Sequence, residues 1–320
     1  MTRHHEGTAP AGGEGVTADE LMQLATELAG LDAAPLDSGV HVPGGGIRRV
    51  IFALDVNVGL LVLAKQLGYD AVIGHHPCAT LLNQGEVYRE HYRLVTRFGL
   101  SEADARAEFG PSLERTVRRL RNRRLRSIYY ESPNQTFLEV DAARALGIAF
   151  LNIHNACDEL GRQIGQNQLD RVLAANPRAP VGALVDTMYD LPETRIAAKH
   201  YDIPLELAIG ERDDPAGRAA FVHGCLSAPE HDIVRFYWRH GIRTVMALHG
   251  AFEDLERLKQ SPEGSLILTG HYAGDSYGFT PFVRALRERG LEVRCMGGAI
   301  DVDEFPDEVA AAGASSAGRR

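Results

Sequence analysis

The stretch Arg48–Pro77 reads RRVIFALDVNVGLLVLAKQLGYDAVIGHHP, and its pattern decides the fold class of the chain. A short apolar run ends at Asp55, a helical pattern follows at 58–68, and a second apolar run ends at the pair His75-His76. This order predicts a strand, a helix and a second strand. Since two strands joined by a helix favour parallel pairing, the stretch indicates the beginning of an α/β sheet.

The same alternation of strands and helices returns later in the chain. The segments are, in order, a helix at 140–146, a strand at 148–153 followed by His154, a strand at 265–270 followed by His271, a helix at 280–289 and a strand at 291–296. We therefore predict an α/β fold with a mostly parallel sheet and flanking helices, and we place the strand at 265–270 in the same sheet as the strands before it.

Two segments depart from this alternation. Residues 81–134 lack strand patterns and carry helical ones, so we predict a helical insertion there. Residues 177–261 have their own strand candidates at 195–197 and 244–248 and a helix at 230–240, which indicates a second, inserted α/β domain. The helical insertion carries a run of arginines, typical of a solvated helix face or of a surface that grips phosphates or an acidic partner. These are Arg115, Arg118, Arg119, Arg121, Arg123, Arg124 and Arg126.

The predicted domain organisation follows from these segments. Residues 17–176 together with 262–305 form the main α/β domain, and 177–261 form the inserted one. Residues 1–16 lack the apolar centre of a signal peptide and are predicted to be a disordered leader. Residues 306–320 are rich in small side chains and are predicted to be a disordered tail. A length of 320 residues fits about two domains.

Composition excludes several functional classes. The chain has 34 Lys plus Arg against 43 Asp plus Glu, a formal net charge of −9, which argues against a nucleic-acid binder because phosphate neutralisation needs clustered cations. No apolar run approaches the roughly 20 residues of a membrane helix. The four cysteines form no CxxC pair, so neither a disulfide framework nor a thiolate zinc cage is indicated. We predict a cytoplasmic protein without a membrane segment.

Histidines follow the predicted strands of the main domain at the point where each strand ends. Because the carboxyl ends of parallel strands meet at one edge of a sheet, these side chains are expected to converge. The segments HNACD and HYAGD share the spacing His-x-x-x-Asp, which puts both side chains on one face if each segment begins a helix. The six candidate ligands are His75, His76, His154, Asp158, His271 and Asp275.

Imidazole and carboxylate groups together are the composition of a transition-metal site. They suit Zn, Fe, Mn, Co or Ni, whereas Mg and Ca prefer oxygen almost alone. Six ligands exceed the need of one zinc ion, so we predict two divalent ions in the main domain. Taken singly, a His-His pair can form a turn and an aspartate in a first helical turn can be a cap. Their joint occurrence after separate strands favours the metal site.

Three further residues have open or different interpretations. Asp55 follows a strand and either supports a ligating histidine or forms a turn. His223 and His249 are each followed by glycine in the inserted domain, and for both a structural or exposed role is favoured over lining a cleft.

These motifs resemble the Nif-three-like family of dinuclear-metal-centre proteins, which includes proteins described as GTP cyclohydrolase 1 type 2. The resemblance rests on the strand ending at Asp55, AVIGHHP at 71–77, IAFLNIHNACD at 148–158 and LILTGHYAGDSYG at 266–278. It implies a two-domain α/β chain with both metals in the cleft between the domains, and six subunits assembled as a toroid. It places metal ligands at His75, His76, Asp158, His271 and Asp275, with His154 adjacent. The chain departs from the family at Asp275, where glutamate is more frequent.

The first functional hypothesis is a metal-dependent hydrolase of the GTP cyclohydrolase 1 type 2 kind, in which a metal-activated water attacks a nucleotide or another small molecule. The sequence identifies no catalytic acid or base. The alternative is a non-enzymatic protein that binds or delivers metal or regulates partners with it. An enzyme keeps exchangeable water at the metal, whereas a carrier transfers metal without turnover. A third interpretation is that the histidines are structural and hold no metal.

Overall fold

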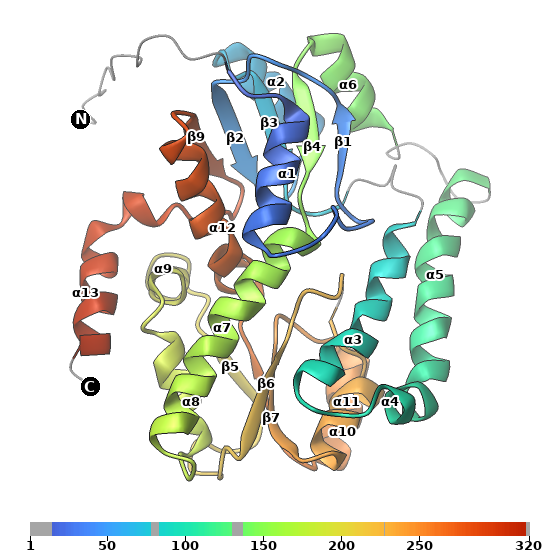
Figure 1. The fold of residues 1–320 in the computed structure, drawn as a ribbon, viewed down its shortest axis with the longest axis vertical. Helices are drawn as coiled ribbons and strands as arrows, with labels where there is room; N and C mark the ends of the chain where they lie inside the picture. The colour runs from blue at the N-terminus through green and yellow to red at the C-terminus, as the bar shows by residue number, and fades with distance from the viewer. Residues whose placement is uncertain (1–14, 78–82, 130–136, 227, 318–320) are drawn as a thin grey trace.

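The computed structural model describes residues 15–77, 83–129, 137–226 and 228–317. Its strands form two sheets that lie one above the other along the long axis of the molecule, each with helices on both faces (Figure 1). Most neighbouring strands within each sheet run parallel, which confirms the predicted α/β class.

The first sheet has the strand order β1-β4-β3-β2-β9. Its strands are β1 (Gly39–Val42), β4 (Ala149–Asn152), β3 (Ala71–Gly74), β2 (Arg49–Ala53) and β9 (Glu292–Met296). All pairs are parallel except the edge pair of β1 with β4. Helix α2 (Val58–Gln66) joins β2 to β3, so the predicted strand-helix-strand unit is present.

Both faces of the first sheet are buried by helices. Val50 and Phe52 of β2 pack with helices α1 (Ala18–Leu28) and α12 (Gly270–Glu288) on one face. Ile51 between them packs with α2 and α6 (Leu138–Leu146) on the other. Since side chains alternate along a strand, a strand covered on both sides is apolar throughout, as this one is.

The second sheet has the strand order β5-β8-β7-β6. Its strands are β5 (Glu206–Ile209), β8 (Ser265–Leu268), β7 (Ile242–Ala247) and β6 (Arg218–Val222). The antiparallel strand is again at an edge, here β5. On one face lie α7 (Asn155–Ala175), α8 (Val181–Met188) and α9 (Pro192–His200), and on the other α10 (His231–Arg239) and α11 (Phe252–Gln260).

The prediction that the strand at 265–270 belongs to the first sheet is wrong. This strand, β8, pairs with β7 and β5 of the second sheet. Leu266 and Leu268 pack on one face of that sheet and Ile267 packs on the other. The chain re-enters the first sheet only at β9. The strand predicted at 195–197 is also wrong, because these residues lie in α9, whose first residue Pro192 favours a helix start.

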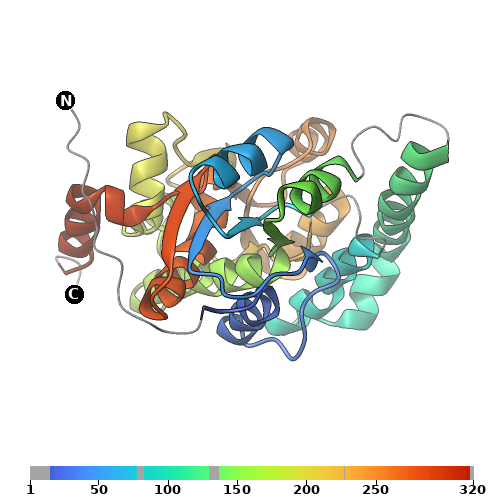
Figure 2. The same ribbon diagram turned by 90° about the horizontal axis from the view of Figure 1, so that it is seen from above.

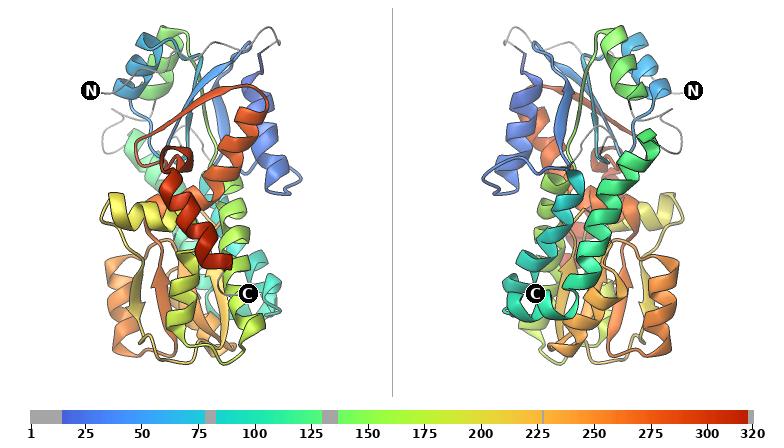
Figure 3. Two further views of the ribbon diagram at one scale, coloured as in Figure 1. Left: turned by 90° about the vertical axis from the view of Figure 1, so that its left-hand side faces the viewer. Right: turned by 90° about the vertical axis from the view of Figure 1, so that its right-hand side faces the viewer.

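The segment between β3 and β4 is helical where it is described, as the predicted insertion at 81–134 requires. It contains η1 (Gln84–Arg89), α3 (Glu90–Arg97), α4 (Glu102–Glu108) and α5 (Gly110–Tyr129). Buried residues of these helices, among them Phe109 and Val117, pack into the same apolar cluster as α10. The insertion therefore covers the second sheet, although in the sequence it lies between β3 and β4 of the first sheet (Figure 3).

The prediction of a disordered tail at 306–320 is wrong for its described part. After the short helix η2 (Val302–Glu304), residues Pro306–Ala317 form helix α13, which lies at the end of the molecule opposite to α5 (Figure 2). The buried carboxylate of Glu308 pairs with Arg195 and Lys199 of α9 and holds the helix in place. Of the predicted leader, residues 1–14 lie outside the described residues, and Val16 forms a β-bridge with Ile47.

Helices α7 and α12 connect the two halves of the molecule. Cys157 of α7 packs in the core of the first sheet, and Leu169 of the same helix packs in the core of the second. In α12, Phe279 packs with the first sheet and Tyr277 with the second. These two bridging helices lie against each other between the sheets (Figure 1). None of the helices in the described residues is long and apolar enough to cross a membrane.

Candidate metal centre

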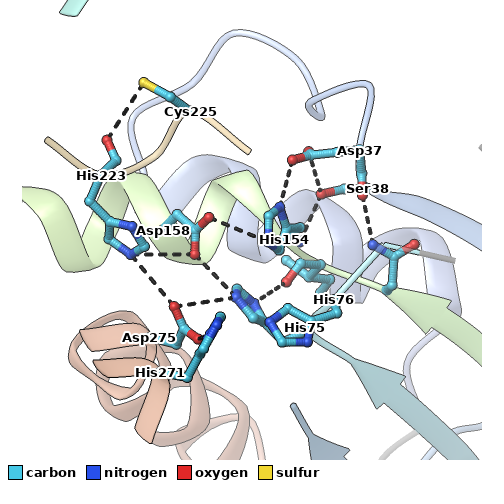
Figure 4. A network of polar contacts seen from close by, with 12 residues as sticks. Asp37, Ser38, His75, His76, His154, Asp158, His223, Cys225, His271 and Asp275 are labelled. Atoms are coloured by element: carbon cyan, nitrogen blue, oxygen red, sulfur yellow. Dashed lines mark hydrogen bonds and ion pairs between the residues drawn. The ribbon is translucent and has the colours of Figure 1, made fainter. Parts of the chain in front are cut away.

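The parallel strands of both sheets end toward the region between the sheets, and histidines and aspartates gather there (Figure 4). The histidines that follow strands are His75 and His76 after β3, His154 after β4, His223 after β6 and His249 after β7. Asp158 lies in the first turn of α7, and His271 and Asp275 lie in the first two turns of α12, after β8. Open α/β sheets bind ligands at this edge.

His75 lies at the centre of the buried part of this cluster. Its Nε2 atom is 3.2 Å from Oδ1 of Asp158 and 3.7 Å from Oδ1 of Asp275. The same two carboxylate oxygens lie 3.5 and 3.8 Å from Nε2 of His223. All four side chains are buried. Two imidazole nitrogens and two carboxylate oxygens, supplied by both halves of the molecule, therefore face one another.

None of these four atoms makes a hydrogen bond within the described residues. Leaving a buried polar atom unpaired costs about 1–3 kcal/mol, so four in one place need an explanation. A divalent ion with bonds of about 2.1 Å holds tetrahedral ligands about 3.4 Å apart. The separations of 3.2 to 3.8 Å match that spacing. The residues present therefore fit a divalent transition-metal ion, which mixed imidazole and carboxylate donors prefer.

A second set of ligand atoms adjoins the first. His76, His271 and Asp275 offer atoms within 4.8 Å of one another, and so do His75, His76 and His154. Oδ2 of Asp275 lies 2.9 Å from Nδ1 of His271, while Oδ1 faces the buried set. A carboxylate that presents one oxygen to each of two neighbouring positions is the arrangement found between paired metal ions. With Asp158, all six predicted ligands are thus brought together.

A cavity of about 110 Å³ lies against this second set of ligand atoms. His76, His154, Asp158, His249 and His271 line it together with apolar residues such as Leu248. The side chain of His271 is 41% exposed and that of His76 is 29% exposed. The second set is therefore open to solvent on one side, as a metal site that binds a substrate must be.

Three of the histidines are oriented through their Nδ1 atoms. Nδ1 of His154 lies 2.7 Å from the buried Asp37, and Nδ1 of His76 lies 2.8 Å from Asp55. Nδ1 of His75 lies 3.1 Å from the carbonyl oxygen of Ile153. Because a carbonyl only accepts hydrogen bonds, Nδ1 of His75 carries a proton, and Nε2 is the nitrogen that would bind a metal in place of its own proton. The contact with His76 also decides the open interpretation of Asp55, which supports a candidate ligand.

The electrostatics of the cluster keep its carboxylates ionised. Burial raises the pKa of Asp158, but the positive charges of His154, His223 and His75 outweigh burial and hold this pKa below its usual range. Burial likewise opposes ionisation of Asp275, and His75 with His271 lowers its pKa well below the ordinary value. Two ionised carboxylates in a buried site provide the charge that a divalent cation needs.

Sequence reasoning missed two residues of the cluster. His223 belongs to its buried part, although an exposed or structural role was favoured for it. RAAFVHG carries the same signal as the segments at His75 and His154, an apolar run ended by a histidine, but its two alanines give only a weak strand pattern. Asp37 lies in a loop without a motif, and only the fold places it behind His154. His249 lies at the edge of the cluster, where its ring contacts that of His271 in a tilted arrangement with 4.8 Å between centroids.

Comparison with known proteins finds a relative of high similarity. No protein-family model matches the chain, and no curated protein matches it in sequence. Among solved structures, a NIF3 superfamily protein from Sphaerobacter thermophilus is 34% identical, with a TM-score of 0.79 over 89% of this chain and 100% of that one. Reduced HcgD from Methanocaldococcus jannaschii is 13% identical with a TM-score of 0.50, over 88% and 99% of the two chains, and shares the fold. Identity above 30% over the whole relative confirms the resemblance seen in the motifs, and the chain belongs to the NIF3 superfamily.

Proposed function

We propose that this protein binds two divalent transition-metal ions between its two sheets and acts as a metal-dependent hydrolase. The observation that carries the metal proposal is the group of four buried, unpaired ligand atoms on His75, Asp158, His223 and Asp275. Membership of the NIF3 superfamily also supports the proposal, because the sequence motifs that carry the candidate ligands resemble those of this family. The identity of the metal within the group Zn, Fe, Mn, Co and Ni is left to measurement.

The residues divide between two positions. His75, Asp158 and His223 would hold one ion, His76 and His271 would hold the other, and Asp275 would contribute to both. His154 lies 3.6 Å from Asp158 and would complete the set. Bound divalent ions in such sites supply Lewis acidity and lower the pKa of a coordinated water toward neutrality.

The open cavity favours an enzyme over a storage protein. A site that only stores metal needs no space beside its ligands, whereas His76 and His271 border a cavity of about 110 Å³. This volume admits water and part of a small molecule. A nucleotide, as in GTP cyclohydrolase 1 type 2, is the substrate implied by the resemblance, and nucleotides are the first compounds to assay.

Elemental analysis of protein purified without a histidine tag tests the metal proposal. We expect about two transition-metal ions per chain in the wild type and loss of both in the double variant His75→Ala, His271→Ala. The matched control is His200→Ala, His240→Ala, which removes two histidines that pair with glutamates outside the cluster. No metal in the wild type after reconstitution would overturn the proposal.

A second experiment separates the hydrolase from a metal carrier. Asp158→Asn keeps the size of the side chain and removes its charge, so turnover by the metal-loaded protein should fall by at least a hundredfold. Metal transfer from the wild type to an apo-acceptor, without turnover of any nucleotide, would instead establish the carrier.

Light scattering tests the hexamer implied by the resemblance, and fractionation of cells tests the proposed cytoplasmic location.

A further inference from the structure

A groove of about 530 Å³ adjoins the cavity at the candidate metal centre. One of its walls is helix α5 of the insertion, with Arg115 and Arg119, and the opposite wall is helix α11, with Arg257 in its last turn. Ala228 and His249 line both the groove and the smaller cavity. A ligand lying in the groove can therefore reach the metal centre without leaving the surface of the protein.

The groove contains cationic groups without partners. Among the described residues, the guanidinium groups of Arg115 and Arg257 form no ion pair or side-chain hydrogen bond, although acidic residues lie nearby. Two of those acidic residues are already engaged. Glu230 accepts hydrogen bonds from the hydroxyl groups of Ser112 and Thr116 and lies 3.7 Å from Arg119. Asp254 lies 2.7 Å from Nδ1 of His231.

Three arginines and three carboxylates line the groove, so its formal charges balance, but Arg115 and Arg257 have no ion-pair partner among the described residues. Arg115 and Arg257 face one unpaired carboxylate on the wall, that of Glu253. Arginine pairs with phosphate through two parallel hydrogen bonds, and two arginines on opposite walls can share the oxygens of one phosphate chain.

We propose that this groove binds the phosphate groups of a small-molecule substrate whose reacting end lies at the metal centre. The inference rests on the proposed function in one respect, that the bound compound is a substrate of the metal centre. Binding of phosphate in the groove does not itself require metal. It gives a specific role to the helical insertion, whose helix α5 supplies one wall. Arg115 and Arg257 are the residues that recognise the phosphate, and Arg119 and Glu230 shape the wall between them.

Calorimetric titration of metal-depleted protein with inorganic triphosphate tests the site. We expect one binding site per chain, with affinity about tenfold weaker in Arg115→Gln and in Arg257→Gln and a larger loss in the double variant. The matched control is Arg118→Gln on the same helix, an exposed residue that does not line the groove, and its affinity should equal that of the wild type. Equal weakening by all three single variants, or no binding by the wild type, would overturn the inference.

Two further measurements separate this inference from the proposed function. The variant His75→Ala, His271→Ala should lose metal and still bind triphosphate with wild-type affinity. Wild-type protein that holds two metal ions but does not bind triphosphate would overturn the proposed phosphate site and leave the metal proposal intact.

Once a hydrolysed phosphate compound is found, Arg257→Gln should raise KM about tenfold with kcat nearly unchanged, because the groove lies away from the reacting end. Tight binding of single-stranded oligonucleotides in preference to triphosphate would contradict a small-molecule site.

Discussion

Gly161 and Gly278 lie backbone to backbone where the two bridging helices cross. A Cβ atom on Gly278 would lie 1.9 Å from the carbonyl oxygen of Cys157, and a Cβ atom on Gly161 would lie 3.1 Å from the backbone nitrogen of Gly278. Each glycine follows an aspartate of the metal centre by three residues, Asp158 in α7 and Asp275 in α12. The absence of two side chains thus lets the helices approach closely enough for their carboxylates to face His75.

Gly278→Ala should push the bridging helices apart. We expect a loss of about 1–3 kcal/mol in the free energy of unfolding, as for other overpacked interiors, together with at least tenfold weaker metal binding. Denaturant unfolding and competition with a chelator measure the two effects. The control is Gly313→Ala in α13, where an added Cβ meets nothing within 4 Å and a helical alanine should stabilise slightly. Unchanged metal affinity in Gly278→Ala would show that the crossing does not position the carboxylates.

Asp37→Asn should weaken metal binding without removing any ligand. The carboxylate of Asp37 lies 2.7 Å from Nδ1 of His154 and orients its ring. Loss of such a supporting carboxylate typically lowers metal affinity 10- to 100-fold. Competition with a chromophoric chelator measures the change, and Asp32→Asn, an exposed residue of the same loop, is the control. Equal affinities of the two variants would mean that His154 needs no orientation.

Glu159→Gln should destabilise the protein strongly. This buried carboxylate pairs with the buried Arg162 at 2.7 Å and also with Arg97 of the insertion. Removing its charge leaves Arg162 buried and uncompensated, which costs about 3–5 kcal/mol. Arg97→Gln should cost less than about 1 kcal/mol, because the side chain is partly exposed and Glu159 keeps Arg162. Urea unfolding of both variants tests this order, and similar losses for the two would contradict it.

The stability of the protein should fall in acid partly because of His91. Burial lowers the pKa of His91 to about 3, and neither ring nitrogen has a hydrogen-bond partner among the residues that the structure describes. In the unfolded chain His91 binds a proton near pH 6.5, whereas in the folded protein it stays neutral down to about pH 3. The free energy of unfolding therefore falls by about 1.4 kcal/mol per pH unit between these two values, and His91 has no effect on it above pH 6.5.

His91→Leu removes this titration and provides the test. Between pH 7 and pH 5 the variant should lose about 2 kcal/mol less stability than the wild type. At pH 7 it should be at least as stable, because two buried unpaired nitrogens are removed. Urea unfolding at both pH values measures the difference. Parallel pH profiles of the two proteins would exclude His91 as the source.

The sequence reveals the parts of the site that have a local signature. His75, His154 and His271 could be predicted because each directly follows an apolar strand, and the two aspartates follow at helical spacing. The sheet that contains β8 could not be predicted, since a strand buried on both faces is apolar throughout in either sheet. Helix α13 also escaped prediction, because its order depends on the contact of Glu308 with a distant helix and not on its own small side chains.

The division of the ligands between the two sheets determines when metal can be bound during synthesis. A nascent chain that has emerged as far as the end of α7 carries His75, His76, His154 and Asp158 but lacks every ligand supplied by the second sheet. The missing residues are His223, His271 and Asp275, and the last of them comes only after β8 has formed the centre of its sheet. The proposed metal ions would therefore be captured late, and they would stabilise the docked halves after folding without directing their early assembly.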